Sequence, residues 1–209
     1  MIEFFNYHKK YGTHKVLSIS ELAIPTGIHW VKGVNGSGKS TLLKSIAGII
    51  PFKGDIHVRR HSIQRNPILA RRQVAYSEAE PMFPVFLTAA EMIEFVAQVR
   101  KVNKEEIEKI EKYFDVDVFQ NQATGGYSAG MLKKLSLSIA FLGETPWILL
   151  DEPFAFIDRE TENKLLELIR RKRRDGINFI LTSHHELDHD LLEFDSVFSI
   201  RNAQLHKIR

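Results

Sequence analysis

Residues 33–41 read GVNGSGKST, and the rest of the chain is best interpreted outward from this stretch. It fits the pattern G-x-x-x-x-G-K-[ST], and the residues at its fixed positions are Gly33, Gly38, Lys39 and Ser40. The apolar run 28–31 before it indicates a buried strand, and residues 41–47 after it indicate a helix. Strand, glycine-rich turn and helix are the context that this pattern requires, so the sequence predicts a phosphate-binding loop.

The chemistry of such a loop assigns roles to its side chains. Glycines let successive backbone N–H groups face one anion with no Cβ in the way, and the following helix presents its positive N-terminal end to the same anion. Lys39 is expected to reach the β- and γ-phosphates of a nucleotide, and the Ser40 hydroxyl is expected to bind Mg²⁺. The other loop residues expected to contact the nucleotide are Gly33, Asn35, Gly36, Ser37, Gly38 and Thr41.

Composition excludes several classes of protein. The 209 residues are 44% hydrophobic and 26% charged, as in ordinary globular proteins. The net charge of +3 comes from 29 basic and 26 acidic residues, a balance too even to indicate a nucleic-acid binder. The absence of cysteine excludes disulfides and thiolate chemistry, in agreement with a reducing compartment. With no leader-like start and no apolar run near the roughly 18 residues of a membrane span, we expect a soluble cytoplasmic protein.

The order of apolar runs predicts an α/β fold. Residues 16–24 alternate, with Val16, Ile19 and Leu22 as expected inward positions, so a small β-layer precedes the loop. Later strands are continuously apolar and alternate with a helix at 161–174; they are expected at 147–150, 177–181 and 197–200. Such strands indicate a mostly parallel sheet that is covered by helices on both faces.

A helical segment interrupts this order. Between Pro81 and Leu142 the pattern becomes helical, with expected helices at 88–102 and 104–114, the first of them capped by Thr88. We therefore expect one domain with a small inserted helical subdomain. The expected division is a nucleotide-binding core of residues 1–79 and 143–209 and a helical subdomain of about residues 80–142.

Two adjacent carboxylates end an apolar strand in the stretch 148–153, which reads ILLDEP. In a phosphate-loop protein the carboxyl end of such a strand faces the nucleotide. Asp151 is therefore placed to hold Mg²⁺, directly or through water. Glu152, one residue later, is placed to orient or deprotonate the attacking water.

Residues 127–131, YSAGM, begin a helical run that extends to Leu142. Here the chain resembles an ABC-type ATPase, whose signature L-S-G-G-Q opens a helix about twenty residues before the acidic strand end. Ser128 and Gly130 match that signature. The departures from it are Tyr127, Ala129 and Met131.

Further landmarks of this family occur in the expected order. Tyr11 resembles the aromatic residue that stacks on adenine, although it also fits an ordinary aromatic at a strand end. Asp158 corresponds to the aspartate of the loop after the acid pair. His184 resembles the switch histidine that contacts the γ-phosphate, with His185 as the competing assignment. A metal cluster within 184–190 is the disfavoured alternative, because the switch assignment already uses the first histidine.

One landmark of the family is missing. The alignment places Ala79 where the family has a glutamine that helps to coordinate Mg²⁺ and couples the helical subdomain to the nucleotide. Either Glu78 or Glu80 can substitute for it, or hydrolysis is weaker or differently coupled. The sequence leaves these alternatives open.

The resemblance implies a functional cycle. In such ATPases two domains sandwich two ATP molecules with Mg²⁺, and Ser128 and Gly130 of one protomer meet the γ-phosphate held by the other. We expect a homodimer whose further partner is an integral-membrane transporter subunit, so that the chain is peripheral on the inner face of the cell membrane; nucleic acid is not an expected partner. The alternatives are a soluble ABC ATPase that acts on nucleic acid or ribosomes, and a weakly hydrolysing regulator.

Overall fold

The structure, a computed structural model, describes residues 1–183 and 192–209. The first of its two sheets is antiparallel and has the strand order β2-β1-β4-β5. Its strands are β1 Ile2–Tyr11, β2 His14–Ile24, β4 Lys53–Val58 and β5 His61–Ser62. It is the small β-layer expected at the N-terminus, and the return of β4 to it was not predicted.

The second sheet has the order β10-β9-β3-β8-β7-β6 and carries the phosphate-binding stretch. Its strands are β3 Ile28–Lys32, β6 Val74–Ser77, β7 Trp147–Leu150, β8 Asn178–Ser183, β9 Ser196–Arg201 and β10 Gln204–Lys207. Every neighbouring pair is parallel except β9 with the edge strand β10. Parallel strands place their carboxyl ends at one edge of a sheet, so the segments after β3, β6 and β7 gather there.

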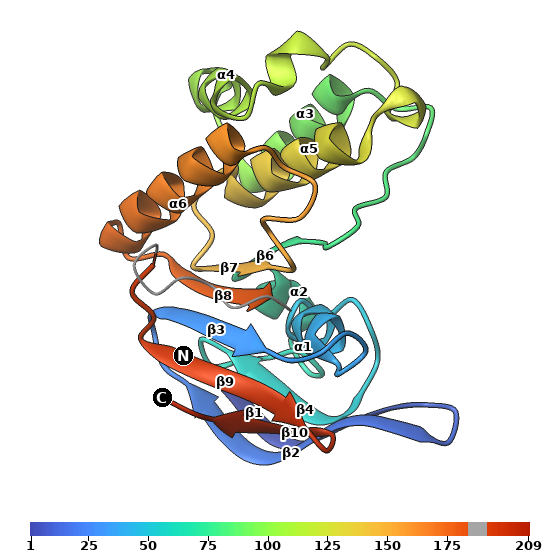
Figure 1. Ribbon diagram of the computed structural model, residues 1–209, viewed down its shortest axis with the longest axis vertical. Coiled ribbons are helices and arrows are strands. Elements are labelled where there is room, and N and C mark those ends of the chain that lie inside the picture. The colour runs from blue at the N-terminus through green and yellow to red at the C-terminus, as the bar shows by residue number, and fades with distance from the viewer. Residues whose placement is uncertain (184–191) are drawn as a thin grey trace.

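The helices complete three layers (Figure 1). Their bounds are α1 Lys39–Ile46, α2 Pro67–Arg71, α3 Ala89–Arg100, α4 Lys104–Tyr113, α5 Ala129–Phe141 and α6 Arg159–Arg174, with short 3-10 turns η1 Val116–Val118 and η2 Thr124–Gly126. Figure 1 shows α3, α4 and α5 together at one end of the molecule, with α6 beside them and the antiparallel sheet at the other end. The predicted α/β fold with a mostly parallel sheet is confirmed.

The parallel sheet is buried on both faces. Ile148 and Leu150 of β7 belong to the hydrophobic core under α3 to α6, while Trp147 and Leu149 belong to the core shared with α1 and the antiparallel sheet. Successive side chains of a strand point to opposite faces, so a strand between two cores needs an unbroken apolar sequence. This is why the run 147–150 has no polar residue.

Helices α3 and α4 each begin at a side chain that caps the helix start. Thr88 accepts a hydrogen bond from the Glu91 N–H (3.2 Å), and the Glu91 carboxylate accepts one from the Thr88 N–H (2.8 Å), which is a complete capping box. Asn103 caps α4 through the Glu106 N–H. These caps satisfy backbone donors that a helix start otherwise leaves unpaired.

A buried histidine in β3 predicts acid sensitivity of the fold. The His29 ring is fully buried against Trp147, its Nε2–H donates to the Pro25 carbonyl (2.8 Å), and Nδ1 has no hydrogen-bond partner among the described residues. Burial lowers the pKa of His29. As pH falls below about 6.5, the unfolded chain binds a proton at this residue and the folded chain does not, so the free energy of unfolding decreases. In urea titrations at pH 7.5 and 5.5, His29→Phe should lose less stability on acidification than the wild type. An equal loss in both proteins would contradict this assignment.

Candidate active site

The phosphate-binding stretch connects β3 to α1, as its sequence predicts. Gly36 and Gly38 have φ of 76° and 107°, a region that other residues rarely adopt, so glycine is required at both turns. Lys39 is the first residue of α1, and within the described part of the chain no side chain caps this helix start. The N-terminal N–H groups of α1 are therefore oriented toward the turn, where they can bind an anion.

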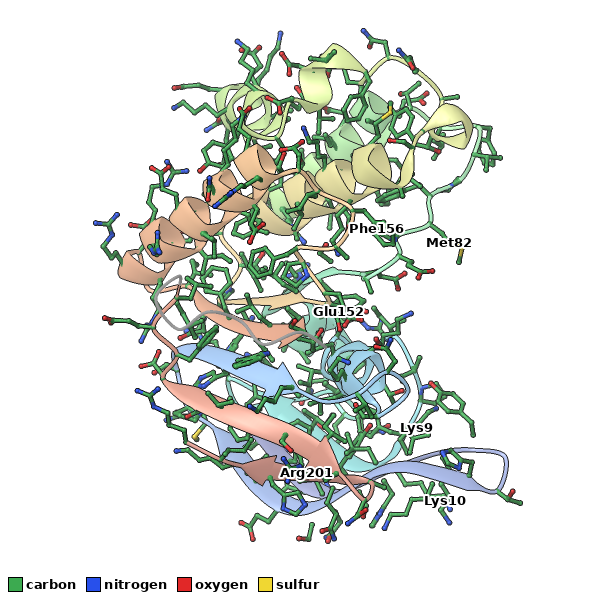
Figure 2. The ribbon with its side chains drawn as sticks, in the orientation of Figure 1. Lys9, Lys10, Met82, Glu152, Phe156 and Arg201 are labelled. Carbon is green, nitrogen blue, oxygen red and sulfur yellow. The ribbon has the colours of Figure 1, made fainter. Side chains whose placement is uncertain are left out.

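Lys39 connects the loop to the acid pair. Its mostly buried ammonium donates to the Gly33 carbonyl (2.8 Å) and lies 3.3 Å from a carboxylate oxygen of Glu152. Glu152 follows β7, and Figure 2 shows it between the helical end of the molecule and α1. The cation that the motif assigns to the phosphates and the proposed base thus share one site.

Two hydroxyl groups and a carboxylate place oxygen atoms at this site that can contact a phosphate or a metal ion. The Ser37 hydroxyl is buried and has no hydrogen-bond partner in the described ranges, so it is available to donate to an oxygen of a bound phosphate. Ser40 follows Lys39 at the start of α1, and Asp151 is 1% exposed at the end of β7. Hydroxyl and carboxylate oxygens are the ligands that Mg²⁺ takes together with substrate phosphates, so these residues fit the metal.

Thr182 holds both carboxylate residues in place. Its hydroxyl donates to Asp151 Oδ1 (2.6 Å) and accepts a hydrogen bond from the Glu152 N–H (3.0 Å). The Tyr76 hydroxyl also donates to Asp151 (3.2 Å). Glu152 has φ of 44°, an unfavourable conformation for a residue with a Cβ, and the bond to Thr182 helps to maintain it. Sequence reasoning missed Thr182 and Tyr76; the only available signal was a polar residue inside an apolar strand.

A pocket of about 540 Å³ is lined by the predicted loop residues other than Gly33, together with Tyr11 and Glu152. Tyr11 comes from the antiparallel sheet and is about half exposed, with Lys9 Nζ 4.5 Å from its ring centre. A half-exposed aromatic ring that lines the same pocket as the phosphate loop suits stacking on a nucleotide base. The loop residues that line the pocket are Asn35, Gly36, Ser37, Gly38, Lys39, Ser40 and Thr41.

The carboxylates offered as replacements for the missing glutamine differ in position. Ala79 and Glu80 line the same pocket. The Glu78 carboxylate instead forms an ion pair with Lys44 of α1 (3.1 Å). Of the two acids, Glu80 is therefore the one available to a ligand in the pocket.

Five predicted residues are not among the described residues that line this pocket, namely Gly33, Ser128, Gly130, Asp151 and Asp158. Ser128 caps α5 by accepting from the Met131 N–H (3.3 Å), and Asp158 caps α6 by accepting from the Thr161 N–H (2.8 Å). A Cβ on Gly130 would lie 2.9 Å from the Phe156 carbonyl, so the two capping segments are in close contact. The assignments at His184 and His185 fall outside the described residues.

The loop, the acid pair and the flanking aromatic residue define a phosphate-loop ATPase. The comparisons give the particular family. Residues 20–155 match the family model described as ABC transporter. The chain is 30% identical to the ABC-type transporter ATP-binding protein EcsA of Bacillus subtilis over 165 residues, which is 77% of this chain and 67% of that protein. This chain belongs to the ABC transporter family, as its ATP-binding and ATP-hydrolysing domain.

Solved structures agree on the fold. An ATP-binding subunit of an ABC transporter has a TM-score of 0.87 at 24% identity, covering 99% of this chain and 90% of that one. An ATP-binding cassette solved as a dimer in a post-hydrolysis state with ADP and phosphate has a TM-score of 0.82 at 18% identity, covering 100% and 99%. The chain spans from 7% to 67% of the length of the curated relatives it matches. No helix within the described residues is long and apolar enough to cross a membrane.

Proposed function

We propose that this chain powers a membrane transporter by binding and hydrolysing ATP between two ABC domains. The single observation that carries the proposal is a set of exposed apolar side chains in the segment that leads from the nucleotide pocket into α3. It follows β6 and continues along α3, and we call it the α3 surface; its residues are Met82, Val85, Phe86, Phe95 and Val99. Large exposed apolar side chains concentrated in one segment are typical of an interaction site.

The residues in and beside the pocket have different roles in hydrolysis. Lys39 and the N–H groups at the start of α1 bind the phosphates, and Tyr11 binds the base. Ser40 and Asp151 would hold Mg²⁺, and the bound metal would neutralise charge on the phosphate oxygens. Glu152 accepts a proton from the water that attacks the γ-phosphate, and the bond to the β-phosphate oxygen breaks as the new bond forms.

A second copy of the domain is expected to complete each site. Ser128 and Gly130 lie outside the pocket of their own chain. The structural relative solved as a dimer with ADP and phosphate supports a second copy of the domain, to whose nucleotide these residues would be presented. Loss of the γ-phosphate would remove the contacts that hold the two domains together. ATP binding would therefore close the dimer and hydrolysis would open it.

An integral-membrane subunit is the partner proposed for the α3 surface. Figure 2 shows Met82 on the segment that joins the pocket side of β6 to the helical end of the molecule, where it is 88% exposed. Because Glu80 lines the pocket and Met82 lies two residues later, a partner bound here is joined directly to the nucleotide site. Movement of the ATPase can in this way reach a membrane protein.

Purification of the tagged chain from a detergent extract of its source cells tests this proposal. The wild type is expected to carry with it an integral-membrane protein. Phe86→Glu, which places a charge on the 77% exposed Phe86 of the α3 surface, is expected to reduce that recovery at least about 10-fold, because burying an unpaired charge costs several kcal/mol. Ile68→Glu on α2, outside the α3 surface, is the matched control and should not reduce it.

The same preparations separate the alternative functions. Recovery with ribosomes or DNA, and never with a membrane protein, would exclude the transporter and favour a soluble ABC ATPase. An absence of steady-state phosphate release in the presence of the membrane partner would favour a regulator that binds nucleotide without turnover.

A further inference from the structure

A buried lysine on α5 joins three segments of the active site. Lys133 has no exposed surface, and its ammonium donates to the carbonyls of Glu78 (2.6 Å), Asp151 (2.9 Å) and, more weakly, Ala79 (3.5 Å). An ammonium has three donors, so three backbone carbonyls use its full capacity. Lys133 is not a residue of the nucleotide pocket described above.

The carbonyls that Lys133 contacts belong to the ends of two neighbouring strands. Glu78 and Ala79 follow β6 directly, and Asp151 follows β7. One side chain of α5 therefore holds the carboxyl ends of two neighbouring parallel strands. A second contact lies one turn further along the helix, where the Ser136 and Ser77 hydroxyls are 2.9 Å apart. Two contacts three residues apart fix both the position and the rotation of α5 against the edge of the sheet that carries the site.

A buried cation at this place has a free-energy cost. Removing an ammonium from water is costly, and its hydrogen bonds offset that cost only while the three carbonyls stay within hydrogen-bond distance. Burial lowers the pKa of Lys133 to about 8, against the opposing effect of Asp151, Glu152 and Glu78. The desolvation cost of this side chain therefore accompanies a set of hydrogen bonds that fix α5 to the two strand ends.

We propose that Lys133 is a positioning residue that couples α5 to the catalytic carboxylates. Ser128 and Gly130 lie at the start of the same helix. When a partner fixes the position of that helix start, Lys133 transmits the constraint through its hydrogen bond to the Asp151 carbonyl and so to the adjoining Glu152. The same side chain holds the backbone at Ala79, which has no polar side chain of its own. This inference rests on the proposed ATP-driven closure of two domains.

Lys133→Met tests the proposal, because methionine fills the same space without donors. The expected result is a fall in kcat for ATP hydrolysis of about 10-fold or more, since small displacements of catalytic groups have effects of that size. KM for ATP should change less than about threefold, because Lys133 does not line the pocket. A lysine with a purely structural role would produce no such separation of kcat from KM.

Arg100→Met is the matched control. Arg100 is also a largely buried cation that donates to backbone carbonyls of this helical end, at Ile139 (2.8 Å) and Leu142 (2.6 Å), but at the far end of α5. Its loss should lower thermal stability and leave kcat within about twofold of the wild type, since it contacts no residue of the site. An equal fall in kcat in both variants would show that general loosening of α5 is responsible and would overturn the proposal.

A second variant keeps the proposal testable if Lys133→Met does not fold. Lys133→Gln retains a shorter, uncharged donor that cannot serve three carbonyls, and it should lose kcat several-fold at unchanged KM. Wild-type kcat in either folded variant would overturn the proposal. Turnover of the wild type in the same assay tests the proposed function separately. If the unmodified chain hydrolyses no ATP with its partner present, the proposed function is wrong. If the wild type turns over normally and the Lys133 variants have the same kcat, only the coupling role of Lys133 is wrong.

Discussion

Glu152→Gln is expected to lower kcat for ATP hydrolysis by about 10²- to 10⁴-fold, the usual contribution of a positioned general base. Glutamine keeps the shape of the side chain and cannot accept the proton of the attacking water. ATP should bind more tightly to this variant, because the carboxylate now 3.3 Å from Lys39 competes with the phosphates for the ammonium. Phosphate release and equilibrium binding of ATP measure the two effects.

The same variant should reveal the closed dimer. With hydrolysis blocked, the γ-phosphate stays in place and the contacts across the interface persist, so light scattering in ATP and Mg²⁺ should show twice the monomer mass. Glu105→Gln is the control, since Glu105 is an exposed carboxylate on α4 that pairs only with its helix neighbour Lys109 among the described residues. If Glu152→Gln neither accumulates a dimer nor loses hydrolysis, the role of Glu152 is wrong.

The sequence predicted those parts of the structure that depend on local patterns. The phosphate loop, the apolar strands and the helix starts follow from short-range rules, and the bounds expected for α3 differ from the observed ones by one or two residues. The expected inward positions in β2 were incomplete. Ile19 is buried and Val16 and Leu22 are partly buried against the same core, but Leu17 and Ile24, which are also buried, were not expected.

Contacts between distant segments could not be predicted. β10 is an edge strand with little apolar sequence, and its place depends on pairing with β9. Thr182 and Lys133 look like ordinary polar residues of a strand and a helix until the fold places them beside Asp151. The choice between Glu78 and Glu80 likewise required the position of Lys44.

Lys39→Met should strongly weaken nucleotide binding. Methionine retains the length of the side chain and removes the cation assigned to the β- and γ-phosphates. A hydrogen bond to a charged group contributes about 1.5–3 kcal/mol, and a mostly buried cation facing a triphosphate is at the upper end, so the affinity for ATP should fall about 100-fold. Calorimetric titration with ATP and Mg²⁺ measures the change.

Lys44→Met separates this effect from a general loss of positive charge on α1. Lys44 lies five residues later on the same helix and pairs with Glu78, outside the nucleotide pocket. Its removal changes the net charge by the same amount as Lys39→Met, yet ATP affinity should change less than about threefold, because a partly exposed charge outside the site is screened by solvent and salt. Equal losses in the two variants would mean that long-range charge, rather than contact with the phosphates, determines binding, and the loop would lose its assigned role.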